Sequence, residues 1–205
     1  MAAILARKLG MSQRFLDDGH VERITVLEAG PCPVTAIRSK ERDGYEAVQL
    51  AFGTCKEKAL TRAELGHLKK ASASAHRHLV EFRDEAGELL LGSTVTVDVF
   101  AAGDKVKISG SSKGKGFQGT IKRHNFKSGP KSHGSHNVRA PGSIGASATP
   151  SRVFKGLRGP GRMGGGRVTQ KGLTVVDVMP KQNLLLVRGA VPGGKGGIVE
   201  VRTDA

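Results

Sequence analysis

The sequence lacks acidic side chains over its longest basic stretch. No Asp or Glu occurs in residues 105–176, a run of 72 residues that carries 15 of the 33 Lys and Arg side chains. Elsewhere basic and acidic side chains are equal in number, so the net charge of +15 falls on this basic run. Because uncompensated repulsion destabilises a compact state, the run must either meet a polyanion or stay extended. A nucleic acid is the favoured polyanion, since Lys and Arg displace the counterions condensed on its phosphates.

Two further absences narrow the class of protein. The sequence has no run of 18 apolar residues, and the apolar stretch near its start is short and soon followed by charge. We therefore expect neither a membrane span nor a signal peptide. Only two cysteines occur, Cys32 and Cys55, and neither belongs to a CxxC pair, which excludes a disulfide framework and a thiolate metal site. We expect a cytoplasmic protein with reduced, structural thiols.

Acidic residues are also missing where enzyme chemistry would need them. Gly114, Gly116 and Gly119 satisfy a GxGxxG pattern after an expected strand, but we expect no amphipathic helix after them, and no acid lies within the next 50 positions to hold a ribose. A nucleotide-dependent enzyme using this loop would bind a free dinucleotide, and we expect no such binding. The run also lacks the acid of a nucleophilic triad. The sequence thus predicts no enzyme, catalytic residue, cofactor or small-molecule substrate.

Outside the basic run the sequence predicts short β-strands. Val, Ile and Thr are enriched in segments that Gly, Pro or Asp separate, and apolar and polar residues alternate in the TVTVDVF segment. The expected strands are residues 23–27, 34–38, 45–52, 94–100, 105–109, 173–178, 184–187 and 198–201. Their even spacing favours a barrel or a sandwich over alternating strands and helices.

One short helix is expected near residues 61–71. Thr61 and Glu64 form a capping box, two leucines one turn apart begin an apolar stripe, and paired lysines suit the helix end. The helix either packs on the barrel with a solvated basic end or serves as a dedicated binding helix.

The basic run is predicted to be an arm. It holds 15 of the 29 glycines, and its apolar residues are too sparse to repay the entropy of ordering, so it should not fold alone. Against RNA, its glycines let the backbone approach phosphates closely. We expect a mainly β fold: a globular β-barrel part over residues 1–120, a basic extended arm over 121–167, and C-terminal strands over 168–205 that complete the barrel.

The candidate RNA-binding side chains are the basic and aromatic groups of this run. Lysines act as point charges on phosphates, whereas arginines also bridge two phosphates or stack on a base. Phe117, Phe126 and Phe154 either stack on exposed bases or anchor their own loops. The histidines either contact RNA or are solvated loop residues, and without a Cys, Asp or Glu neighbour they predict no metal site. The predicted contacts are Lys113, Lys115, Phe117, Lys122, Arg123, His124, Lys127, Lys131, His133, His136, Arg139, Arg152, Lys155, Arg158, Arg162, Arg167 and Lys171.

Sequence blocks along the chain share the pattern of one known family. The basic run carries SGSSKGKGFQGTIKRHN (109–125), APGSIG (140–145), TPSRVFKG (149–156) and GRMGGGRV (161–168). The flanks carry ILARKLGMSQRF (4–15), VLEAGPCP (26–33), YEAVQLAFG (45–53) and NLLLVRGAVP (183–192). Together these blocks cover essentially the whole chain and resemble those of bacterial large-subunit ribosomal protein three.

This resemblance implies a fold and a place in a complex. It implies a translation-factor-like β-barrel with a small helical insertion on the outside of the large ribosomal subunit. A long, irregular extension then runs through rRNA toward the peptidyl transferase centre, over residues 121–167 with its tip at 141–152. The resemblance further implies binding near the 3′ end of 23S rRNA, a role in nucleating subunit assembly, and contacts with the fourteenth and nineteenth large-subunit proteins. A free-standing RNA chaperone or regulator is the alternative interpretation.

Three positions depart from the family pattern. Ala148 stands where some relatives carry a methylated glutamine before the Thr-Pro of the tip, so that modification is impossible here. Lys107 stands where the pattern often has Asp or Asn, and it adds a phosphate-seeking charge. His124 replaces the tryptophan of some relatives, which leaves a smaller and titratable ring.

Overall fold

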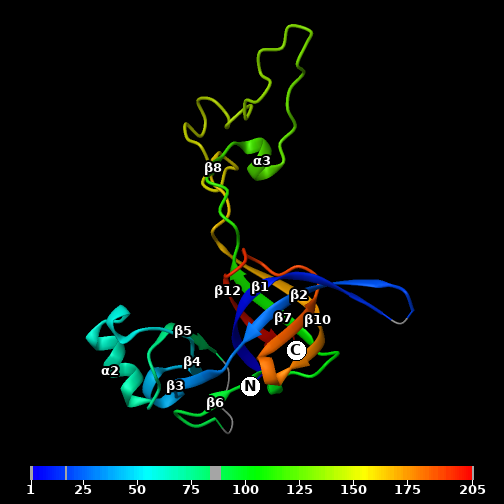
Figure 1. Ribbon diagram of the computed structural model, residues 1–205. Helices are drawn as coiled ribbons and strands as arrows, with labels where there is room; N and C mark the ends of the chain where they lie inside the picture. Colours follow the sequence, from blue (N-terminus) through cyan, green and yellow to red (C-terminus); the bar gives the residue numbers. More distant parts are fainter. Residues whose placement is uncertain (1, 17, 84–88, 205) are drawn as a thin grey trace. The chain divides into compact units, whose positions relative to one another are not determined.

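The computed structural model describes residues 2–16, 18–83 and 89–204 and has two compact units (Figure 1). The barrel unit comprises Met1–Ser112 and Arg167–Ala205, and the arm unit comprises Lys113–Gly166. Among the helices in the described ranges, none has the length and apolar character needed to cross a membrane.

Six antiparallel strands close a barrel in the order β1-β12-β7-β10-β11-β2 (Figure 1). Their bounds are Ala3–Phe15 for β1, Val21–Ala29 for β2, Lys105–Ser111 for β7, Arg167–Met179 for β10, Leu184–Arg188 for β11 and Ile198–Thr203 for β12. Val106 and Ile108, two residues apart on β7, are both fully buried, as the alternation of side chains along a strand requires. The mainly β fold with a barrel is confirmed.

A second sheet, of order β5-β4-β3-β6, packs against the barrel. Its strands are β3 Cys32–Arg38, β4 Ala47–Thr54, β5 His76–Phe82 and β6 Thr94–Val95. The short elements of the barrel unit are α1 Lys40–Asp43, α2 Arg62–Lys70 and the 3-10 helices η1 Glu57–Ala59, η2 Val97–Val99 and η3 Pro180–Gln182. One hydrophobic cluster joins the two sheets, with Val34, Leu50 and Phe82 from the second sheet and Leu5 and Val199 from the barrel.

The expected capping box of α2 is confirmed. The Thr61 hydroxyl accepts a hydrogen bond from the Glu64 backbone N–H at 3.3 Å, and the Glu64 carboxylate accepts one from the Thr61 N–H at 2.8 Å. Leu68 is buried. The helix therefore docks on the second sheet by a narrow apolar stripe, and its basic end lies in solvent.

The expected strand over residues 94–100 is wrong beyond Val95. The chain turns there into η2, in which the Thr96 hydroxyl donates to the Asp98 carboxylate at 2.8 Å. Val97 and Phe100 are buried at a spacing of three, which a 3-10 turn satisfies and a strand does not. A local side-chain bond thus competes with the extended backbone that the alternating pattern predicted.

Two strands of the barrel unit, β1 and β5, were not predicted. In β1 the first half is almost continuously buried, because it lines the barrel and also contacts β4 of the second sheet. A strand covered on both faces shows no apolar–polar alternation. The second half of β1 pairs with β2 as a hairpin, residues 10–15 with 21–26, and is mostly exposed. In β5 charged residues and histidines occupy most positions, so the sequence shows no run of apolar strand formers. Backbone pairing with β4 stabilises the strand instead.

Candidate nucleic-acid interface

A small clasp brings together the two ends of the arm unit. Strand β8 (Phe117–Gln118) pairs with β9 (Gly161–Arg162). The Lys115 N–H donates to the Met163 carbonyl, and the Met163 N–H donates to the Gly116 carbonyl, each at 2.9 Å. Backbone pairing of the clasp therefore includes Lys115 and Gly116, within the glycine-rich GxGxxG segment.

A short helix follows this segment, where we expected no amphipathic helix. Helix α3 spans Thr120–His124, and Thr120 is its one buried residue. Five residues make little more than one turn, which is too short for the crossover helix of a dinucleotide fold.

Arg123 and His124, both predicted RNA contacts, are half-buried and engaged within the arm unit. The Arg123 guanidinium donates to the Gly159 carbonyl at 2.7 Å, and His124 Nε2 donates to the same oxygen at 3.1 Å. A Cβ built on Gly161 would lie 2.8 Å from Arg123 Nη1, so the guanidinium uses the space that this glycine leaves. The two side chains therefore tie α3 to the returning chain.

The other predicted contacts are exposed. These are Lys113, Lys115, Phe117, Lys122, Lys127, Lys131, His133, His136, Arg139, Arg152, Lys155, Arg158, Arg162, Arg167 and Lys171. In the described ranges, Arg167 is the only one of them with a carboxylate partner, Glu200, and it lies with Lys171 on β10 of the barrel unit. The arm unit contains no acidic residue, so the positive potential of its cations is not neutralised within the unit and can attract an external anion.

Large apolar side chains are exposed between these cations. Phe117 is 77% exposed and Phe154 is 61% exposed, and the Arg152 guanidinium lies 5.7 Å from the Phe154 ring centroid. Phe126 is half-buried, with its ring centroid 6.2 Å from that of His124. An aromatic face beside a guanidinium is a surface on which a base can stack. Phe154 fits this role and Phe117 offers an exposed ring face, whereas Phe126 anchors its own loop.

The sequence reasoning missed the apolar residues of the arm. Ile144, Val153 and Leu157 are each about half exposed or more. The signal was present, because large apolar side chains in a glycine-rich segment without a core have no buried place to occupy.

The histidines of the arm form no metal centre. Among the residues that the structure describes, no group of three or more His, Cys, Asp or Glu side chains is placed to hold a metal ion. The polar atoms of the arm are instead backbone amides, hydroxyls and cations, a set suited to phosphate oxygens.

Comparisons with known proteins place the chain in a family. The model of the family described as ribosomal protein L3 matches residues 76–182. The chain is 56% identical to the large ribosomal subunit protein uL3 of Gloeobacter violaceus, over 97% of this chain and 93% of the relative. It is 52% identical to the protein of the same name from Acidothermus cellulolyticus, over 98% and 92%, and 50% identical to that of Prochlorococcus marinus, over 98% and 93%. This chain belongs to the ribosomal protein L3 family.

Proposed function

We propose that this chain, a structural constituent of the large ribosomal subunit in the bacterial cytoplasm and not an enzyme, binds 23S rRNA through its arm and nucleates subunit assembly. One observation carries the proposal: the cations of the arm unit other than Arg123 are exposed, and the unit contains no acidic residue. Such a surface repels itself until phosphates surround it.

The two parts of the chain have different tasks in this proposal. The barrel unit, Met1–Ser112 and Arg167–Ala205, buries its own core and needs no RNA to fold. The arm unit, Lys113–Gly166, orders its irregular part against folded rRNA, and the clasp of β8 and β9 holds its two chain ends together. Arginines hold the RNA fold more firmly than lysines do, because a planar guanidinium contacts two phosphate oxygens at once.

The finer placement follows the family resemblance. The arm tip, residues 141–152, extends toward the peptidyl transferase centre, and the contact region lies near the 3′ end of the 23S rRNA. The globular part meets the fourteenth and nineteenth large-subunit proteins. The exposed apolar residues of the arm, such as Ile144 and Phe154, suit unstacked bases better than water.

A charge-neutralising triple variant tests the proposal. We expect Arg139→Gln, Arg152→Gln and Arg158→Gln together to leave the melting temperature of the barrel unchanged and to reduce the yield of mature large subunits. The control changes three exposed cations outside the arm, Lys56, Lys58 and Arg62, to Gln. A normal yield from the arm variant would contradict the proposal.

The rival function, a free-standing RNA chaperone, is separated by a salt wash. Peripheral binding through six to ten phosphates loses about 10³ to 10⁵ in affinity between 50 and 200 mM salt. A chaperone therefore leaves the large subunit in a high-salt sucrose gradient, whereas a structural constituent stays at one copy per subunit.

A further inference from the structure

A cavity of about 480 Å³ opens on the second sheet, in the barrel unit and far along the chain from the arm. Its ionisable lining residues are Arg38 from β3, Arg42 from α1, and His67 and Lys70 from α2. Ile37 and Leu91 give it an apolar wall. Every ionisable side chain that lines the cavity is thus of the basic type, although the barrel unit as a whole contains acids.

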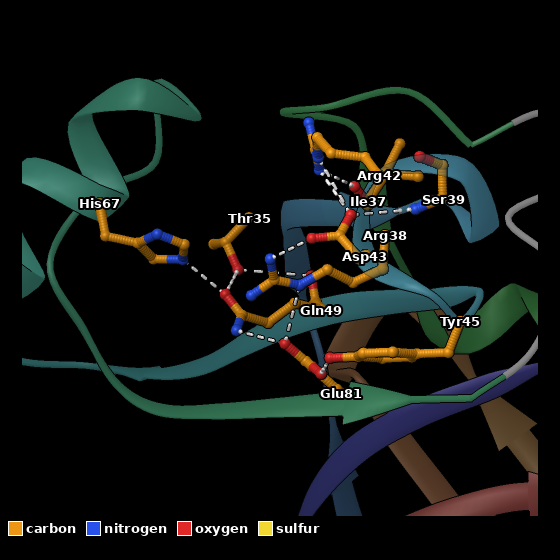
Figure 2. A network of polar contacts seen from close by, with 10 residues as sticks. All are labelled: Thr35, Ile37, Arg38, Ser39, Arg42, Asp43, Tyr45, Gln49, His67 and Glu81. Atoms are coloured by element: carbon orange, nitrogen blue, oxygen red, sulfur yellow. Dashed lines mark hydrogen bonds and ion pairs between the residues drawn. The ribbon is translucent and has the colours of Figure 1, made fainter.

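A hydrogen-bond network fixes the floor of this cavity (Figure 2). The Gln49 Oε1 atom accepts from the Thr35 hydroxyl at 2.8 Å and from His67 at 2.6 Å, and Gln49 Nε2 donates to Glu81 at 3.4 Å. Because an amide oxygen only accepts, His67 Nε2 carries a hydrogen, and Nδ1 is the ring atom left for another partner. The ring is therefore held in one tautomer and tied to the sheet.

The neighbouring carboxylates are already engaged with the arginines. Asp43 accepts from Arg38 Nη1 at 2.9 Å and from Arg42 Nε at 3.0 Å, and Glu81 accepts from Arg38 Nε at 3.3 Å and from the Tyr45 hydroxyl at 2.8 Å. Desolvation acts to raise the pKa of Asp43, but the hydrogen bonds from Arg42, Ser39 and Arg38 outweigh it and lower that pKa. These carboxylates hold the guanidiniums in place without lining the cavity.

Both arginines keep donors for a further ligand. The Arg38 contacts use Nε and Nη1, and the Arg42 contacts use Nε and Nη2, which also donates to the Ile37 carbonyl at 3.1 Å. Within the described parts of the chain, Nη2 of Arg38 and Nη1 of Arg42 have no protein acceptor. Preorganised guanidinium donors beside a lysine form a set that matches the oxygens of a phosphate.

We infer that this cavity binds a phosphodiester of RNA and so gives the barrel unit an RNA contact of its own, separate from the arm. The inference rests on the proposed function, because it takes rRNA as the polyanion. Arg42 and Lys70 contact the phosphate oxygens, Arg38 donates from the floor, and the adjoining sugar lies against Ile37 and Leu91.

The salt dependence of RNA binding tests this contact in the full-length chain. The variant Arg42→Gln with Lys70→Gln removes two exposed cations, and the matched control Lys40→Gln with Lys69→Gln removes two exposed cations from the same helices outside the cavity. Each lost contact lowers the slope of log K against log salt by about 0.7 to 0.9. Because the two chains bind equally at the 1 M reference, the double variant binds a 23S rRNA transcript about 25- to 60-fold more weakly than the unsubstituted chain at 0.1 M salt. Circular dichroism and melting confirm that each variant is folded, and Lys70→Gln alone serves if the pair is not.

Three results separate this inference from the proposed function. Loss of slope in the cavity variant and not in the control supports the inference. If the salt slope falls in the arm variant and not in the cavity variant, the inference is overturned and the proposed function stands. If the slope falls in neither variant, the proposed function is overturned, and with it the inference that rests on it. Titration with inorganic phosphate, followed by the NMR resonance of the Arg42 Nε–H group, tests whether the ligand is instead a free anion. If phosphate shifts this resonance while the salt slope of RNA binding is the same in the cavity variant, the RNA contact is overturned in favour of a free anion.

Discussion

The clasp at the base of the arm depends on Arg123, and removing its charge should loosen the clasp. Arg123→Met keeps an unbranched apolar stem and removes the 2.7 Å charge-assisted hydrogen bond from the guanidinium to the Gly159 carbonyl. Hydrogen bonds to charged groups contribute about 1.5 to 3 kcal/mol, and the half-buried position of this guanidinium reduces the value to about 1 to 2 kcal/mol. Local opening of the clasp then becomes about 5- to 30-fold more frequent.

Amide hydrogen exchange measures this opening directly. The Lys115 and Met163 N–H groups close the clasp, so their protection should fall by that factor, while the amides of β7 in the barrel keep theirs. Lys122→Met is the control, because Lys122 is an exposed cation on the same short helix. Unchanged exchange in Arg123→Met, or equal loss of protection in both variants, would refute the structural role of Arg123.

Three further predictions concern the barrel unit. Ile108→Ala leaves a cavity at a fully buried position and should lower the free energy of unfolding by about 2 to 5 kcal/mol in urea denaturation; a change below about 1 kcal/mol would contradict the packing. Burial raises the pKa of the Cys32 thiol from 9.0 to about 12, so its contribution to stability is present below pH 9 and is lost as the pH rises toward 12. Iodoacetamide at pH 8 should therefore modify Cys55 in the native chain and Cys32 only after unfolding, and equal rates would count against this burial. Hydrogen bonds from the backbone and hydroxyl of Thr61 lower the pKa of Glu64. The ionised Glu64 carboxylate therefore stabilises the folded chain above its unfolded-state pKa, and this stabilisation is lost as the pH falls through its folded-state pKa. Thr61→Ala should raise that pKa in an NMR titration, and no rise would show that the capping box does not form.

The sequence predicted those strands that have one face in a core and one in water. Val106 and Ile108 alternate with polar neighbours, and β7 follows that pattern. The start of β1 could not be predicted in this way, because tertiary packing covers both of its faces. The turn at η2 depends on the local bond between Thr96 and Asp98, which an alternating pattern does not reveal.

The candidate site was predictable in its charge and less so in its contacts. A run without acids has no internal partners for its cations, so the exposure of Lys127 or Arg139 follows from composition alone. The role of Arg123 does not follow from composition, because its acceptor, Gly159, lies 36 residues away. The same holds for the cavity of the second sheet, where Arg38, Arg42 and Lys70 meet only through folding of three separate elements.

The most direct test of the central claim is a crosslinking map of the chain within intact large subunits. Ultraviolet crosslinking followed by mass spectrometry identifies which residues lie against rRNA. The proposal predicts crosslinked peptides from residues 127–158, including Phe154, whose exposed ring lies beside Arg152. Crosslinks confined to the barrel unit, with none in the arm, would contradict the claim that the acid-free arm is the principal contact with RNA.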